Sequence, residues 1–142
     1  MRRVLLDENL PRKLRRELSE FVVRTVQEEG WTSLANGELL GQAQHSFDVL
    51  LTADRRLQFQ QNVPRFDIGV VVIVTPSLRY RTIKTAVESI RTALKAVMPG
   101  EVTQVQVPER PPIRRRDAAG PAAGTAAFRV ISPRSTAPAS RP

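Results

Sequence analysis

Two short apolar runs in this sequence each lead to an acidic side chain. The run at residues 4–6 is followed directly by Asp7, and the run at 49–51 is followed by Thr52 and, two residues later, by Asp54. Short runs that are apolar at every position are typical of strands buried on both faces, as in a parallel sheet. Ligands of open α/β sheets bind outside the carboxyl ends of the strands, so we predict that Asp7 and Asp54 converge on one site. The simpler alternative is that each acid caps the helix that follows it.

Glu38 adds a third carboxylate, because it lies in the first turn of a helix predicted to begin at Asn36. Carboxylate oxygens in a chain without cysteine favour Mg²⁺ or Mn²⁺ over zinc. Such an ion can polarise a phosphodiester and activate water. We therefore expect Asp7, Glu38 and Asp54 to be the catalytic and metal-binding residues. A favourable interaction with the helix dipole is the alternative role for Glu38.

Polar and basic residues surround these acids in the sequence. Neighbouring polar groups can orient metal-binding carboxylates, and the supporting residues expected here are Glu8, Asn9 and Thr52. A basic helix after the first strand and two arginines after Asp54 make a nucleic-acid backbone the natural substrate. The residues expected to bind nucleic acid are Arg12, Lys13, Arg16, Arg55 and Arg56. A solvated helix face is the alternative role for the cations of that helix.

Other titratable residues do not fit this site. Asp48 and Asp67 precede predicted strands, and a strand advances about 3.3 Å per residue, so Asp48 lies at the opposite end of its strand from Asp54. His45 stands near the end of a predicted helix, where the helix dipole favours a cation. We expect all three to be surface residues.

The apolar patterns predict alternating strands and helices. The predicted strands are 3–6, 21–25, 49–52, 70–74 and 102–107, with the last at a sheet edge. The predicted helices begin at Asn9 and cover 36–46, 55–61 and 81–97. This alternation predicts a three-layer α/β/α sandwich with a mostly parallel central sheet.

Charge and composition divide the chain into a domain and a tail. The 142 residues carry a net charge of +8, of which residues 1–107 contribute +3 and residues 108–142 contribute +5. The last segment also holds seven of the eleven prolines. We predict one α/β domain at 1–107 and a disordered basic tail at 108–142, rich in proline, alanine and arginine. The start of the chain does not resemble a signal peptide and no apolar run is long enough to span a bilayer, so we expect no membrane association and a cytoplasmic location.

Three motifs carry a resemblance to a known family. LLDENLP at 5–11, NGELL at 36–40 and FDVLLTADRRLQFQQN at 47–62 are followed by a valine-rich strand and a long helix. This pattern resembles the PIN-like family of small proteins, which is related to the PIN-domain ribonucleases of bacterial toxin–antitoxin systems. The resemblance covers about residues 1–107 and implies a compact α/β/α fold and metal-dependent RNA cleavage. Carried over, its acids are Asp7, Glu38 and Asp54. The partners to expect are RNA, a cognate antitoxin protein and a second copy of the chain.

Two positions depart from the family pattern and keep other functions open. Many relatives have an acid where this chain has Arg56, and the helix acid often stands at the position of Gly37. A nuclease-dead PIN-like module that binds RNA or acts in regulation is therefore the alternative. A receiver domain of response regulators is a third hypothesis, since it also has acids after its first and third strands, and Thr75 resembles its switch threonine. The predicted last strand lacks the lysine that receivers need.

Overall fold

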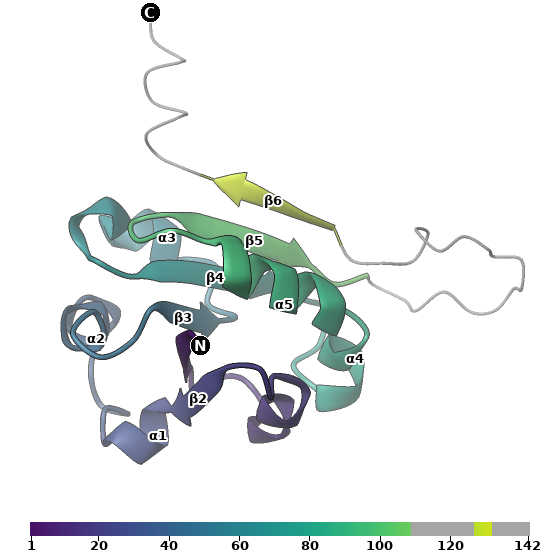
Figure 1. The fold of residues 1–142 in the computed structure, drawn as a ribbon. Coiled ribbons are helices and arrows are strands. Elements are labelled where there is room, and N and C mark those ends of the chain that lie inside the picture. Colours follow the sequence, from purple (N-terminus) through teal and green to yellow (C-terminus); the bar gives the residue numbers. More distant parts are fainter. Residues whose placement is uncertain (109–126, 132–142) are drawn as a thin grey trace, which may run out of the picture.

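A six-stranded sheet forms the centre of the protein. The computed structural model describes residues 1–108 and 127–131. The strands are β1 (Arg3–Leu6), β2 (Val22–Thr25), β3 (Val49–Thr52), β4 (Gly69–Val74), β5 (Val102–Gln106) and β6 (Ala127–Ile131). Their order is β2-β1-β3-β4-β5-β6, and the first five run parallel while β6 pairs antiparallel with β5 (Figure 1).

Strands β1 and β3 are neighbours in the interior of the sheet, as predicted. Val4 pairs with Val49, and the register continues through Leu6 and Leu51. All the apolar residues of both strands are fully buried. An apolar side chain at every position lets a strand bury both of its faces, which explains why the two runs occupy this place.

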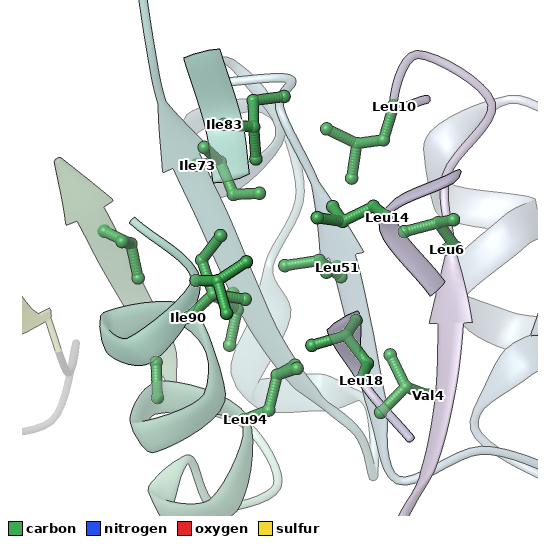
Figure 2. Packing of buried hydrophobic residues seen from close by; sticks show 14 of the residues in the cluster. Val4, Leu6, Leu10, Leu14, Leu18, Leu51, Ile73, Ile83, Ile90 and Leu94 are labelled. Atoms are coloured by element: carbon green, nitrogen blue, oxygen red, sulfur yellow. The ribbon is translucent and has the colours of Figure 1, made fainter. Parts of the chain in front are cut away.

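Helices cover both faces of the sheet, which confirms the three-layer α/β/α sandwich. One face carries the 3₁₀ helix η1 (Arg12–Glu17) together with the α-helices α4 (Tyr80–Lys84) and α5 (Val87–Ala96). The other face carries α1 (Val26–Glu29), α2 (Asn36–Ala43), α3 (Leu57–Gln60) and the 3₁₀ helix η2 (Val63–Arg65). Figure 2 shows the first of these layers. Ile90 and Leu94 of α5 lie on one side of Leu51 of β3, and Leu14 and Leu18 lie on its other side, all on the same face of the sheet.

Two predicted helices differ from the observed ones. The helix expected from Asn9 is the 3₁₀ helix η1, preceded by Pro11, and no side chain caps it. The single helix expected at 81–97 is divided into α4 and α5 between Lys84 and Val87. At the break, Thr85 Oγ1 donates to the carbonyl of Thr82 at 2.7 Å. Thr85 thus satisfies a carbonyl of the last turn of α4 with its side chain, at the point where the helix is interrupted.

The predicted edge strand and part of the predicted tail also need correction. Strand β5 does not form the edge, because β6 pairs along its full length from Val102 to Gln106. Residues 127–131 are therefore a strand, and the prediction of a disordered tail over 108–142 is wrong for them. The rest of that prediction, at 109–126 and 132–142, lies outside the described residues.

Candidate functional site at the ends of strands β1 and β3

The order of the strands places a switch point between β1 and β3. From β1 the chain moves to β2 through η1 on one face of the sheet, and from β3 it moves to β4 through α3 on the other face. Where the order reverses in this way, the connections diverge and leave a crevice outside the carboxyl ends of the two strands. Asp7 follows β1 directly, and Asp54 lies two residues after the end of β3. Both acids thus stand at the point where open α/β sheets generally bind their ligands.

The hydroxyl of Thr52 links the two acids. Thr52 is fully buried, and its Oγ1 donates to Asp7 Oδ2 at 2.6 Å. The same oxygen accepts a hydrogen bond from the backbone N–H of Asp54 at 3.0 Å. A short bond from a hydroxyl to a carboxylate is among the stronger hydrogen bonds in proteins, so the position of Asp7 is fixed relative to the backbone of Asp54.

Asp7 is a buried carboxylate without a cationic partner. It is 8% exposed, and its Oδ1 accepts a hydrogen bond from the backbone N–H of Glu8 at 2.8 Å. No lysine or arginine in the described part of the chain forms an ion pair with it. A buried charge is costly unless it is paired or binds a metal ion, so this side chain offers a place for a cation.

The other supporting residues predicted from the sequence have different positions. Asn9 Oδ1 accepts a hydrogen bond from the backbone N–H of Ala53 at 3.3 Å, which ties the loop after β1 to the end of β3. Asn9 therefore connects the two strand ends through the backbone and makes no bond to either carboxylate. The side chain of Glu8 is exposed, and its contribution to Asp7 comes from its backbone N–H.

Asp54 is held by groups from two other positions. Asn36 Nδ2 donates to Asp54 Oδ2 at 3.1 Å, while Oδ1 accepts from the backbone N–H of Arg56 at 3.0 Å and from its guanidinium at 3.4 Å. Partial burial opposes ionisation of Asp54, but these hydrogen bonds outweigh it and hold the pKa of the carboxyl below its ordinary value. The sequence prediction missed Asn36, although it stands two residues before Glu38 in the same helix turn.

Glu38 has a local role in its own helix. Its Oε1 accepts a hydrogen bond from the backbone N–H of Ala35 at 3.2 Å, at the start of α2. Within residues 1–108 and 127–131, no group of three or more histidine, cysteine or acidic side chains is placed to hold a metal ion. The structure therefore does not gather Glu38 with Asp7 and Asp54, and a three-carboxylate metal site stays a prediction.

Gly37 occupies the position where the helix acid often stands in PIN-like proteins. A Cβ atom added to Gly37 would lie 2.8 Å from Oε1 of Gln61. Because a real Cβ essentially never approaches another atom so closely, any side chain at this position requires Gln61 to move. The first turn of α2 thus faces the segment after α3, with Asn36 directed to Asp54.

Two carboxylates suffice for one class of metal site. Mg²⁺ is commonly held by one or two protein carboxylates, with waters and substrate phosphates as its other ligands. Asp7 and Asp54 supply that number of carboxylates at one end of the sheet, and each oxygen that already accepts a hydrogen bond keeps further lone-pair capacity. The residues present therefore fit Mg²⁺ or Mn²⁺, and the supporting observation is that the carboxyl group of Asp7 is buried and has no cationic partner among the described residues.

The cations predicted to bind nucleic acid divide into two groups. Arg12, Lys13 and Arg16 are exposed on η1, which follows the carboxyl end of β1. Arg56 is 76% exposed on its side chain and forms an ion pair with Asp54, whereas Arg55 is exposed and has no ion pair in the described part of the chain. The five positions are thus accessible, and only Arg56 contacts a candidate catalytic residue.

The residues excluded from the site are found away from it. Asp48 lies at the start of β3 and pairs with Arg3, and Asp67 is exposed before β4. His45 is exposed after α2. These positions agree with the surface roles predicted for them.

Comparison with known proteins gives no relative. No family model, curated protein or solved structure matches the chain. The resemblance to the PIN-like family therefore stays a prediction carried by the three motifs. Among the residues that the structure describes, no helix has the length and apolar character needed to cross a membrane.

Proposed function

We propose that the protein is a metal-dependent ribonuclease, which cleaves RNA at the ends of β1 and β3 with Mg²⁺ or Mn²⁺ as its cofactor. The observation that carries the proposal is the position of Asp7. It is a buried carboxylate without a cationic partner among the described residues, joined through Thr52 to the backbone of a second acid at the switch point. A bound Mg²⁺ or Mn²⁺ would polarise the phosphodiester and lower the pKa of a water molecule.

The residues of the chain have separate tasks in this proposal. Asp7 and Asp54 hold the cation, and Thr52 keeps Asp7 in one orientation through the 2.6 Å hydrogen bond. Asn36 holds the second oxygen of Asp54. Arg56 forms an ion pair with the other oxygen of Asp54, Oδ1, where it would compete with a metal ion, but its side chain is 76% exposed. Exposed ion pairs contribute about 0–1 kcal/mol, so the guanidinium is easily displaced and becomes available to a phosphate.

The partners of the proposal follow from the site and from the family resemblance. The exposed cations of η1 favour the backbone of RNA as the substrate. A cognate antitoxin, a homodimer and a cytoplasmic location rest on the sequence alone and stay predictions.

The proposal is tested by cleavage of single-stranded RNA in Mn²⁺ and in EDTA. Asp54→Asn keeps the shape of the side chain and removes its charge, so we expect it to abolish cleavage. Asp48→Asn is the matched control on the same strand, and we expect it to cleave like the wild type. Glu38→Gln retains an oxygen for the N–H of Ala35, and its activity decides whether a third acid takes part. Cleavage that persists in Asp54→Asn or in EDTA would sink the mechanism.

An RNA-binding module without nuclease activity is the second candidate. The observations that favour it are the ion pair between Arg56 and Asp54, at 3.4 Å, and the local role of Glu38. In that case the wild type binds RNA without cleaving it, and binding survives Asp54→Asn. Arg56→Asp then removes the ion pair and adds the acid that many PIN-like proteins have, so gain of Mn²⁺-dependent cleavage would show that Arg56 blocks the site.

A further inference from the structure

We propose that η1 and α4 together form a binding surface for the phosphate backbone of single-stranded RNA, organised around the ring of Tyr80. This surface, called here the Tyr80 surface, combines residues far apart in the sequence. Its cations are Arg12, Lys13, Arg16, Arg79, Arg81 and Lys84, all of which are exposed. The inference rests on the proposed function, since this surface would bind the RNA that Asp7 and Asp54 are proposed to cleave.

Tyr80 holds one lysine from each of the two elements. The Nζ atom of Lys13 lies 5.7 Å from the centroid of the Tyr80 ring, and that of Lys84 lies 5.6 Å from it. An ammonium group within about 6 Å of an aromatic centroid is attracted to the ring. The hydroxyl of Tyr80 donates a hydrogen bond to Glu17, which fixes the ring against η1. The ring thus draws together two positive charges that would otherwise repel each other.

The cations of the Tyr80 surface have no ion-pair partners in the described part of the chain. Several other cations do have partners: Arg15 pairs with Glu28, Arg24 with Glu29, and both Arg91 and Lys95 with Glu20. None of the six cations of the Tyr80 surface forms an ion pair with an acid of residues 1–108 or 127–131. Glu17 is an acid beside this surface, bonded to the hydroxyl of Tyr80, but six cations outnumber it and raise the local positive potential, which attracts a polyanion.

The Tyr80 surface lies at the same end of the sheet as the acid pair. Helix η1 begins five residues after Asp7, and α4 begins six residues after the last residue of β4, Val74. Both elements therefore follow the carboxyl ends of parallel strands, at the same end of the sheet as Asp54. A nucleic-acid strand bound here would therefore pass the ends of the strands to reach Asp54, whose carboxylate is bonded by Asn36 of α2.

The experiment measures binding of a labelled single-stranded RNA by fluorescence anisotropy, in EDTA, at a series of salt concentrations. Each lysine that contacts a phosphate contributes about 0.7 to the slope of log affinity against log salt for a single strand. We expect Lys13→Gln and Lys84→Gln each to weaken binding and to lower this slope by about that amount. Lys95→Gln removes the same charge from an exposed lysine paired with Glu20, and we expect it to leave the slope unchanged.

Variants of Tyr80 test whether the ring positions the lysines. Tyr80→Phe keeps the ring and loses only the hydrogen bond to Glu17, so it should bind RNA more tightly than Tyr80→Leu. Tyr80→Leu removes the ring while both lysines remain, and should weaken binding. Equal slopes in the wild type, Lys13→Gln and Lys84→Gln would overturn the inference, as would an equal loss of slope in Lys95→Gln.

Failure of this inference is distinguishable from failure of the proposed nuclease. Binding is measured without metal, whereas cleavage requires it. Lysine-dependent binding without cleavage would support the Tyr80 surface and count against the nuclease. Cleavage by a protein whose RNA binding does not depend on Lys13 and Lys84 would support the nuclease and count against the Tyr80 surface.

Discussion

Strand β3 carries an aspartate near each end, and the two ends hold β1 in different ways. At the start of the strand, Asp48 Oδ2 accepts a hydrogen bond from the backbone N–H of Arg3 at 2.8 Å and lies 3.6 Å from its guanidinium. At the other end, Thr52 donates to Asp7 at 2.6 Å. Both contacts join residues 45 positions apart, the offset that the register of the two strands imposes. The two ends therefore fasten the same pair of strands.

The difference between the ends lies in charge compensation. The side chain of Asp48 is 40% exposed and has a cationic partner, so it costs little to keep charged. Asp7 is 8% exposed and has none among the described residues. If the sole task of Asp7 were to hold β1 to β3, an exposed ion pair like that of Asp48 with Arg3 would serve as well. A buried carboxylate without a cationic partner is an arrangement that a bound cation stabilises.

The largest expected effect comes from Asp7→Asn, measured as the shift in unfolding free energy on adding Mn²⁺. The wild type should gain about 2.7 kcal/mol when the free ion is at 100 times its dissociation constant, and Asp7→Asn should gain almost nothing. Without metal, the variant loses a buried charge and one hydrogen-bond acceptor, so its stability should stay within about 1 kcal/mol of the wild type. Asp48→Asn is the control and should keep the full metal effect. If Asp7→Asn keeps it too, the two ends of β3 do not differ in cation binding.

A second effect comes from Thr52→Val, which replaces the linking hydroxyl with a methyl group of similar size. The change leaves one oxygen of Asp7 and the backbone N–H of Asp54 without the partner that joins them. An unsatisfied buried polar group costs about 1–3 kcal/mol, so we expect a loss of that size in urea unfolding. Thr92→Val removes an exposed hydroxyl bonded to the carbonyl of Glu88 and should cost less than about 0.5 kcal/mol. Equal losses of unfolding free energy in both variants would show that the buried hydrogen bonds of Thr52 stabilise the fold no more than the exposed one of Thr92.

Local pattern sufficed to predict the central strands and their acids. The runs at 4–6 and 49–51 are apolar at every position, and this requires two covered faces wherever the strands are placed. Asp7 and Asp54 follow these runs in the sequence, so their position at the sheet end comes with the strands. The partner of Asp7 followed from the same logic, because Thr52 ends the neighbouring strand.

Contacts between distant segments could not be predicted in this way. The hydrogen bond from Asn36 to Asp54 joins residues 18 positions apart. The hydrogen bond from Tyr80 to Glu17, where α4 packs on η1, joins residues 63 positions apart. Both depend on how distant segments are placed in the fold. The hydrogen bond from the backbone N–H of Ala35 to Glu38 is local, and the role of Glu38 in the acid cluster stays a prediction. Strand β6 was not predicted because proline, alanine and arginine dominate 108–142, although residues 127–131 within it are mostly apolar.

The smallest expected effect concerns the pH dependence of the stability that Asp54 contributes. Its pKa is lowered below the ordinary 3.8, because hydrogen bonds from Asn36 and Arg56 outweigh the opposing effect of burial. A lowered pKa in the folded state gives stability that is fully present above the ordinary value and is lost as the pH falls through the folded one. The stability difference between the wild type and Asp54→Asn should therefore be constant from pH 7 to about pH 5 and should narrow below about pH 4. Urea unfolding of both proteins across this range, without metal, measures it. A difference that grows as the pH falls would mean that the folded protein favours the protonated carboxyl, and that the hydrogen bonds to Asp54 do not stabilise its charge.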